Sequence, residues 1–275
     1  MATTSHPISL AHLTVLDTTL PELVTVAAAA GFRTIGIRLT ATPSVGVPPY
    51  DILRDGPILR ETLLRLGDAG VSVLDTEFLR FEPDQPVGVP EGFLEVSARL
   101  GAKNVLVMSA EPDEARTIER FGDLCDRAAA YGLQVCLEFA VYTGVRTLAH
   151  AAQVVAKAKR PNASVLVDAL HFSRSGGIPA HIGQVDPALL RYAQICDASP
   201  EIPTTVEGLI HAARCERLLP GEGGIDLAGV FATLPKDLPI SVEIPNETRL
   251  PVLGAEEWAR RALAASISTL AHLAA

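Results

Sequence analysis

The sequence alternates between short runs rich in β-branched residues and longer amphipathic or alanine-rich runs, and the alternation repeats about eight times. The short runs, which we interpret as strands, are residues 10–15, 34–39, 71–78, 104–109, 134–140, 164–170, 192–198 and 239–244. Helical patterns occupy residues 21–31, 57–70, 91–101, 112–132, 145–158 and 255–273. Strands that alternate with helices form a parallel sheet, because each helix carries the chain back to the starting edge. Eight such units predict an α/β fold, a closed (β/α)8 TIM barrel.

The same alternation fits an open, doubly wound sheet less well. Such a sheet usually carries a glycine-rich turn after an early strand, whereas the first run is followed here by LDTTLPE. No linker or charge block interrupts the pattern, so we expect one barrel domain over residues 1–275. The Pro- and Gly-rich segments 41–57 and 82–90 fall where βα loops should lie and are expected to shape a substrate pocket.

Composition narrows the class of partner. The chain has 48% hydrophobic residues and a net charge of −9, and it has no basic patch for phosphate binding, so a small molecule is a better expectation than nucleic acid. No signal peptide and no membrane-spanning run is evident, and we expect a soluble, cytoplasmic protein. The four cysteines form no CxxC pair, which argues against a disulfide framework or a zinc knuckle and favours buried thiols.

Polar side chains end four successive candidate strands. They are Glu138, Asp168, Gln194 and Glu243, and the strand of Gln194 reaches on to Asp197. In a barrel of this kind the active site lies at the carboxyl ends of the strands, so these groups should meet at one rim. Three carboxylates and an amide repel one another unless a cation or a proton is shared, and oxygen donors suit Mg²⁺ or Mn²⁺.

The competing interpretation makes each acid an independent helix cap or surface ion-pair partner. The segments LEF, VDA and VEI, however, place the acid directly after buried apolar residues, where an unpaired charge is costly. We therefore prefer one divalent metal ion.

These residues resemble the sugar phosphate isomerase/epimerase family, the xylose isomerase-like barrels that include hydroxypyruvate isomerase, ketose 3-epimerases, inosose dehydratase and 3-dehydroshikimate dehydratase. The resemblance covers essentially the whole chain, from residues 21–39 through CLEF, VDALH and QICDA to RLLPGEGGIDL and SVEI. It implies that one divalent ion, Mn²⁺ or Mg²⁺ with Co²⁺ or Zn²⁺ as alternatives, is bound by Glu138, Asp168, Gln194 and Glu243. It also implies that His171 and Arg217 contact the substrate.

The sequence departs from individual branches of that family. Ketose 3-epimerases carry a second glutamate six residues after the strand-five ligand, where this chain has Gly144. Gln194 is similar to hydroxypyruvate isomerase and to 3-dehydroshikimate dehydratase, and the long segment 198–216 resembles the dehydratase branch. The histidine that such dehydratases carry after strand three is absent, and Glu77 is either an acid/base or substrate-binding substitute or a loop ion-pair partner.

These features give a mechanistic hypothesis. The metal would bind a carbonyl and an adjacent hydroxyl of a polyhydroxylated substrate and stabilise the enediolate formed on deprotonation. Glu138 and Glu243 would remove and return the proton, which gives isomerisation or epimerisation. His171 would contact the polarised oxygen, unless it only caps the next helix. Arg217 would anchor an anionic group or hydroxyl, unless it forms a surface ion pair with Glu216 or Glu222.

Four functions are considered. We expect first a metal-dependent isomerase or epimerase of a sugar, sugar phosphate or keto-acid. The alternative is a dehydratase, in which loss of a β-hydroxyl follows the same proton abstraction. The complete set of four metal ligands disfavours a barrel that only binds a metabolite. The absence of further His/Asp clusters disfavours a multi-zinc apurinic-site nuclease. Dimers or tetramers are common among such barrels, but no segment of this sequence specifies an interface. The loop 220–224 is expected either to fold over the pocket or to form a turn.

Overall fold

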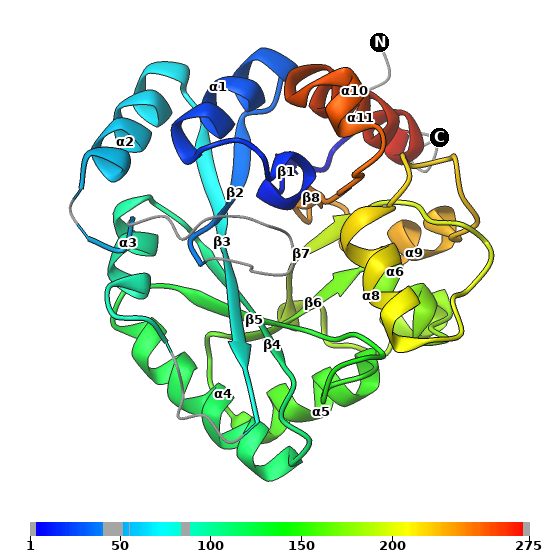
Figure 1. The fold of residues 1–275 in the computed structure, drawn as a ribbon. Helices are drawn as coiled ribbons and strands as arrows, with labels where there is room; N and C mark the ends of the chain where they lie inside the picture. The colour runs from blue at the N-terminus through cyan, green and yellow to red at the C-terminus, as the bar shows by residue number, and fades with distance from the viewer. Residues whose placement is uncertain (1–3, 41–51, 55, 84–88, 272–275) are drawn as a thin grey trace.

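The computed structural model describes residues 4–40, 52–54, 56–83 and 89–271. Eight parallel strands close into one barrel in the order β1 to β8, and each strand pairs with the strands before and after it in sequence. Figure 1 shows these strands at the centre of the molecule with the helices around them. The predicted (β/α)8 fold is therefore confirmed.

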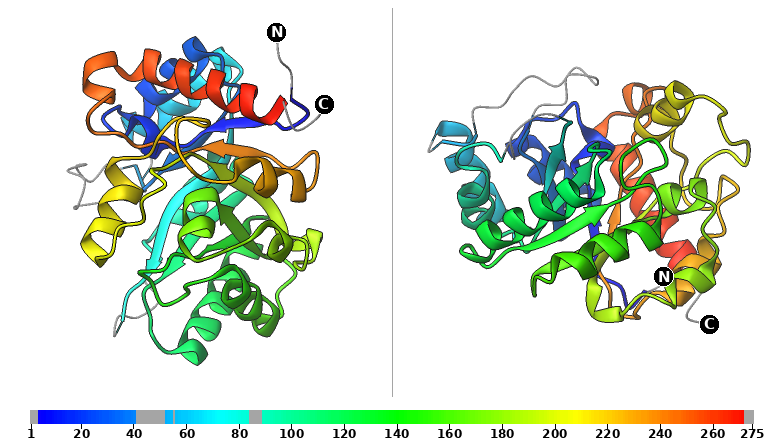
Figure 2. Two further views of the ribbon diagram at one scale, coloured as in Figure 1. Left: turned by 90° about the vertical axis from the view of Figure 1, so that its right-hand side faces the viewer. Right: turned by 90° about the horizontal axis from the view of Figure 1, so that it is seen from below.

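The elements follow the predicted alternation. The strands are β1 (Ile8–Leu10), β2 (Thr34–Arg38), β3 (Ser72–Phe81), β4 (Asn104–Ser109), β5 (Gln134–Glu138), β6 (Ala163–Asp168), β7 (Leu190–Ile195) and β8 (Ile240–Val242). The helices of the outer ring include α1 (Leu20–Ala30), α2 (Pro57–Ala69), α3 (Phe93–Arg99), α4 (Glu114–Ala129), α5 (Leu148–Ala158) and α11 (Ala255–Ala271). Helix α11 packs beside α1, so the last helix closes the ring that the first one starts (Figure 2).

Local sequence explains the helix ends. Helix α1 begins with a capping box between Thr19 and Glu22 and has Pro21 in its first turn. It ends at Gly31, whose φ of 101° lies in the left-handed region that side chains rarely adopt. This agrees with the start and stop signals in the sequence.

The predicted first strand, residues 10–15, is wrong over most of its length. The chain forms β1 at Ile8–Leu10 and then a short 3₁₀ helix, η1 (His12–Val15), whose residues are all buried. Thr14 in η1 donates a hydrogen bond to the carbonyl of Val242 at 2.8 Å. A continuous apolar run is compatible with a buried strand or a buried helical turn, and this contact with β8 selects the turn.

Strand six ends at Asp168, as the prediction of this acid at a strand end required, and the following residues begin α6 (Ala169–Arg174). The Asp168 side chain caps this helix by accepting a hydrogen bond from the backbone N–H of His171 at 2.9 Å. Helices α7 (Pro179–Ile182), α8 (Val206–Cys215), α9 (Leu227–Thr233) and α10 (Leu250–Leu253), and the 3₁₀ helix η3 (Pro187–Leu189), were not anticipated as separate elements.

Two apolar regions hold the fold together. The larger lies between the strands and the helices and includes Phe121, Phe172 and Trp258. The smaller fills the barrel interior and consists of Leu74, Leu106, Cys136, Leu166 and Tyr192. The interior is therefore a packed core, and the active site of such a barrel is expected above it, at the carboxyl ends of the strands.

Three of the four cysteines are buried free thiols, as expected, but Cys215 at the end of α8 is only partly buried. Among the described residues, no helix combines the length and apolar character needed to cross a membrane. Most of the two predicted pocket-shaping loops, at 41–51, 55 and 84–88, lies outside the described residues.

Candidate active site

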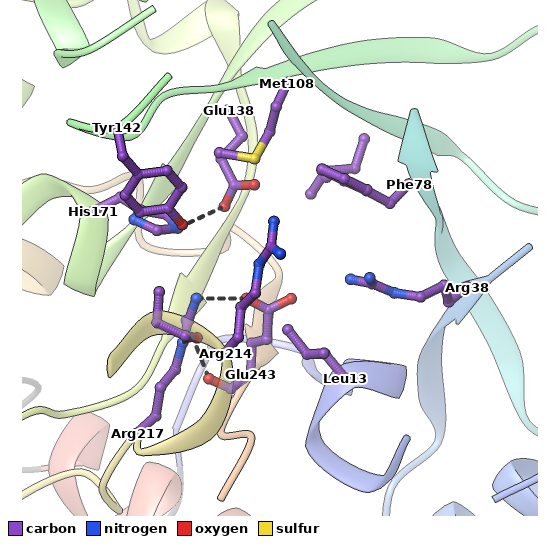
Figure 3. A pocket seen from close by; sticks show the side chains of 12 residues that line it. Leu13, Arg38, Phe78, Met108, Glu138, Tyr142, His171, Arg214, Arg217 and Glu243 are labelled. Carbon is purple, nitrogen blue, oxygen red and sulfur yellow. Dashed lines mark hydrogen bonds and ion pairs between the residues drawn. The ribbon is translucent and has the colours of Figure 1, made fainter. Parts of the chain in front are cut away.

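A pocket opens at the carboxyl ends of the strands. Its walls include apolar side chains, two of the predicted ligands, the predicted histidine and three arginines (Figure 3). The lining residues are Leu13, Arg38, Phe78, Leu106, Met108, Glu138, Tyr142, His171, Ala213, Arg214, Arg217 and Glu243. The predicted rim is therefore a real cavity with polar and apolar walls.

Three predicted carboxylates converge at this pocket. Glu138 ends β5, Asp168 ends β6 and Glu243 directly follows β8. One oxygen of each lies within 4.8 Å of the others, and all three side chains are buried. This separation is small enough for one divalent ion to bind all three.

Gln194 comes from the strand between Asp168 and Glu243. It pairs in register with Asp168 on β6 and with Ser241 on β8. The side chain is fully buried, and neither its Oε1 nor its Nε2 has a hydrogen-bond partner within the part of the chain that the structure describes. A buried amide without partners is costly, and coordination of its Oε1 to a metal ion would satisfy the oxygen.

Arg217 supplies positive charge to the same cluster. Its Nη1 lies 2.6 Å from Asp168 Oδ2 and its Nη2 lies 3.0 Å from Glu243 Oε2. Its Nε donates to the carbonyl of Ala213 at 2.7 Å, and the side chain is 2% exposed. The alternative of a surface ion pair with Glu216 or Glu222 is therefore wrong, because Arg217 is buried against two of the predicted ligands.

One guanidinium does not neutralise three carboxylates. Burial raises the pKa of Glu138 well above its ordinary value, and the neighbouring Glu243 and Asp168 raise it further. Burial likewise raises the pKa of Glu243 to about 7, although Arg217 opposes that shift. Burial also disfavours the charged form of Asp168, but Arg217 and His171 outweigh it, and the pKa of Asp168 is lowered.

The cluster therefore favours additional positive charge. A proton satisfies part of this demand, and a divalent ion held by Glu138, Asp168, Glu243 and the Gln194 amide would satisfy all of it. The donor set consists of oxygen atoms, which suits a hard divalent cation. These residues thus fit the metal that the sequence predicted.

His171 faces this cluster from α6. Its Nε2 lies 3.9 Å from Glu138 Oε1, and its ring packs edge-on against Tyr142 with centroids 5.7 Å apart. Burial lowers the pKa of His171 to about 4, so the imidazole is neutral near pH 7. Its side chain does not cap α6, because Asp168 performs that function, and the ring is left to face the pocket.

Glu77 lies inside β3 rather than in a loop and is 1% exposed. Its Oε2 lies 3.2 Å from Nη2 of Arg38. Arg38 also lies over the ring of Phe78 at 5.3 Å and lines the pocket, whereas Glu77 is not among the lining residues. The geometry makes Glu77 an ion-pair partner that orients a pocket arginine.

Sequence reasoning missed Arg38 and Arg214. Both point toward the middle of the pocket in Figure 3, from β2 and from α8. Arg38 ends a strand, so the strand-end rule that identified the acids could have identified it. Arg214 lies in the last turn of α8, three residues before Arg217, which follows the end of the helix.

A second missed group is Asp75 in the barrel interior. It is fully buried and accepts a hydrogen bond from the Tyr192 hydroxyl at 3.3 Å. Burial and the nearby Glu77 raise the pKa of Asp75 well above its ordinary value. Asp75 lies below the pocket and is not one of its lining residues.

The loop 220–224 folds around Asp197. The backbone N–H groups of Gly221, Gly223 and Ile225 donate to the Asp197 carboxylate at 3.0, 2.9 and 3.1 Å. The loop does not line the pocket. Of its two predicted roles, the structure therefore supports the turn.

The family model for the xylose isomerase-like TIM barrel matches residues 91–269. Among curated proteins, 3-dehydroshikimate dehydratase from Pseudomonas aeruginosa is 27% identical over 84% of this chain, and its counterpart from Pseudomonas putida is 26% identical over 84%. The chain spans 37% of the length of each of these relatives.

Solved structures share the fold. The IolI protein with a bound zinc atom superposes with a TM-score of 0.82 at 22% identity, over 97% of this chain and 99% of that one. D-allulose 3-epimerase from a Methylomonas species, in complex with D-allulose, has a TM-score of 0.68 at 16% identity, over 96% and 97% of the two chains.

Proposed function

This chain is an enzyme of the xylose isomerase-like TIM barrel family. From that starting point we propose that it is a divalent-metal-dependent dehydratase. Its substrate would be a carboxylate-bearing β-hydroxy ketone of the 3-dehydroshikimate type. The observation that carries the proposal is the pocket itself, in which Arg38 and Arg214 stand beside the carboxylates Glu138 and Glu243. The two sequence relatives over 84% of the chain support the same class. This choice reverses the order expected from sequence, in which isomerisation came first.

The pocket arginines Arg38 and Arg214 are the reason for proposing an acidic substrate. A guanidinium binds a carboxylate through paired N–H donors, and such charged hydrogen bonds are stronger in a partly buried pocket than in water. Arg38 is held by Glu77, and Arg214 projects from α8 on another side of the pocket. A substrate carboxylate would give both guanidinium groups a charged acceptor in the pocket, which a neutral sugar does not supply.

The oxygen cluster would hold the metal. A divalent cation bound by Glu138, Asp168, Gln194 and Glu243 supplies Lewis-acid stabilisation of the negative charge that develops on the substrate carbonyl. Asp168 is fixed by its bond to the His171 backbone N–H, and Arg217 fixes both Asp168 and Glu243. The ligands are thus oriented before substrate binds.

Glu138 and His171 would move the proton. The Oε1 atom of Glu138 accepts no hydrogen bond within the described chain, and Glu138 lines the pocket, so this oxygen would be available as the base for the proton next to the carbonyl. His171 Nε2, 3.9 Å away, would pass that proton to the departing β-hydroxyl. The C–H and C–O bonds break, a C=C bond forms and one water molecule leaves.

Isomerisation or epimerisation remains the second candidate. Glu138 and Glu243 are on separate strands and both have raised pKa values, which would let one remove a proton and the other return it. Against a ketose 3-epimerase in particular, the position of the additional glutamate is Gly144. A Cβ there would lie 2.1 Å from the carbonyl oxygen of Glu111, so no side chain fits.

The test is a mass-resolved assay of the metal-loaded protein with dehydroshikimate, inososes, hydroxypyruvate and ketoses. Dehydration lowers the product mass by one water, whereas isomerisation conserves the formula. We expect loss of water from the acidic ring substrate, and loss of turnover in E138Q and in E243Q. Conversion of a ketose without change of mass, with dehydroshikimate unreacted, would reject the dehydratase in favour of the isomerase.

A further inference from the structure

A second group of metal-ligand side chains lies outside the pocket. His211 and Cys215 stand four residues apart on α8, and Glu247 lies in the segment after β8. One ligand atom of each, the imidazole nitrogen, the thiol sulfur and a carboxylate oxygen, lies within 4.8 Å of the other two. The i, i+4 spacing places the two helical ligands on one side of the helix.

The backbone holds these two segments together. The N–H of Glu247 donates to the carbonyl of Cys215 at 2.8 Å, and Glu216 forms an antiparallel bridge with Asn246. The separation of the ligands is thus set by main-chain hydrogen bonds and not by side-chain rotamers alone. A site organised in this way binds a cation without first ordering two independent segments.

The three side chains already lie close to one another. Partial burial and the Glu247 carboxylate, to which the thiol hydrogen-bonds, raise the pKa of Cys215. His211 Nε2 lies 3.8 Å from Glu247 Oε1 and 3.8 Å from Glu216 Oε1. A cation would replace the thiol proton and lie between three donors of different chemistry.

We propose that His211, Cys215 and Glu247 form a second metal site, specific for a thiophilic divalent cation such as Zn²⁺. Nitrogen and sulfur donors select zinc over Mg²⁺ or Mn²⁺, in contrast to the oxygen donors of the pocket. Three protein ligands leave a fourth tetrahedral position, for which water and Glu216 are the available donors. Because His211 and Glu247 are more than half exposed, the cation enters from solvent.

This site lies next to the part of the chain that carries the pocket arginines. Arg214 is within the last turn of α8, and the carbonyl of Arg217 accepts a hydrogen bond from the Asn246 side chain at 2.9 Å. A cation joining α8 to Glu247 therefore ties the arginine segment to the segment that follows Glu243. Its binding should stabilise the folded protein, because the unfolded chain does not present this arrangement.

Cobalt is the most direct probe, since a cysteine thiolate bound to Co²⁺ gives a near-ultraviolet charge-transfer band that oxygen ligands do not. We expect Co²⁺ titration of the full chain to produce this band, and zinc to displace the cobalt and raise the melting temperature. C215S should abolish the band. H211Q and E247Q should weaken the site by at least about tenfold, since even the loss of a ligand's hydrogen-bond partner commonly costs that much.

Two controls separate this site from the pocket. E138Q removes a pocket ligand and should leave the cobalt band intact. C196S removes a buried thiol close to Arg217 and should also retain it. The absence of a band in the unmodified protein, its survival in C215S, or its loss in C196S alone would overturn the proposal, and none of these results bears on catalysis.

Discussion

Arg217 lies 2.6 Å from Asp168 and 3.0 Å from Glu243, so one buried guanidinium bridges two of the four predicted metal ligands. Its position offsets part of the repulsion within the cluster of buried acids. All three arginines line the pocket, but Arg217 is the one that the structure shows paired with the predicted ligands Asp168 and Glu243.

The first prediction concerns the stability supplied by Arg217. Replacing Arg217 by Ala leaves Asp168 and Glu243 with uncompensated buried charge, and the free energy of unfolding of the metal-free protein should fall by about 3 kcal/mol. Saturating Mn²⁺ should recover part of this loss, which urea unfolding with and without metal measures. R65A removes an exposed ion pair with Glu61 and should cost less than about 1 kcal/mol. Equal losses in the two variants would contradict the proposed role.

The second prediction concerns anion recognition by Arg214. R214A should raise KM for a carboxylate substrate by about 10- to 100-fold, the loss expected for a charged hydrogen bond, with a smaller effect on kcat. The corresponding amide or ester should be affected much less. R214K keeps the positive charge but lacks the planar guanidinium, and its KM for the carboxylate substrate should lie between those of the parent and R214A. The same change in KM for the charged and the neutral substrate would exclude Arg214 from anion binding.

The third prediction concerns the unpaired amide of Gln194. Q194L removes a buried polar group that has no hydrogen-bond partner in the described chain, so the metal-free protein should be as stable as the parent or more stable. Metal affinity should fall by about tenfold or more, measured by calorimetric titration, because a ligand is lost. Q194H restores a side-chain atom that can coordinate the metal and should recover much of the metal affinity. Unchanged affinity in Q194L would remove Gln194 from the ligand set.

The fourth prediction concerns Gly144. G144A places a Cβ 2.1 Å from the carbonyl oxygen of Glu111, a backbone atom that cannot move aside independently, and should destabilise the protein by about 1–3 kcal/mol. Gly67 in α2 provides the matched control, because a Cβ there meets nothing within 4 Å. G67A should stabilise the protein by about 1 kcal/mol through helix propensity. A neutral G144A would show that a side chain can be accommodated and would reopen the epimerase interpretation.

The barrel and the convergence of the strand-end acids could be predicted from sequence because both follow from repetition. Once eight βα units are recognised, the closure of the sheet dictates that Glu138, Asp168 and Glu243 lie at one rim. Sequence periodicity could not reveal how the guanidinium of Arg217 is shared among those acids. That arrangement depends on contacts between α8, β6 and β8, which lie far apart in the chain.

The errors in the sequence analysis have a common physical origin. The run at residues 10–15 is apolar throughout, and local pattern does not distinguish a buried strand from the buried turn of η1. The β-branched run at residues 71–78 was too short for a related reason, because β3 continues to Phe81, where it pairs with β4. In both places the pairing of neighbouring strands, rather than local propensity, determines the boundary.

The last prediction concerns pH and the buried His12. Its Nε2 lies 3.1 Å from the carbonyl of Thr18, and its Nδ1 accepts a hydrogen bond from the backbone N–H of Arg38 at 3.4 Å. The ring is therefore neutral, with its proton on Nε2, because a second ring proton would face the N–H of Arg38. Burial lowers the pKa of His12 from 6.5 to about 4, and the Arg38 charge contributes to the lowering.

The sign of the effect on stability follows from where the proton binds. Between pH 6.5 and about 4 the unfolded chain takes up a proton on His12 that the folded protein rejects, so the free energy of unfolding falls as the pH falls through this range. At about 1.4 kcal/mol per pKa unit, the full loss is roughly 3 kcal/mol. H12Q keeps one donor and one acceptor without a titrating group, and urea unfolding from pH 7 to pH 4 should show a shallower decline than in the parent. His171, whose pKa is also lowered, is common to both proteins and cancels in the difference. Parallel pH profiles for H12Q and the parent would mean that His12 accepts a proton in the folded barrel, against the hydrogen bonds that hold it neutral.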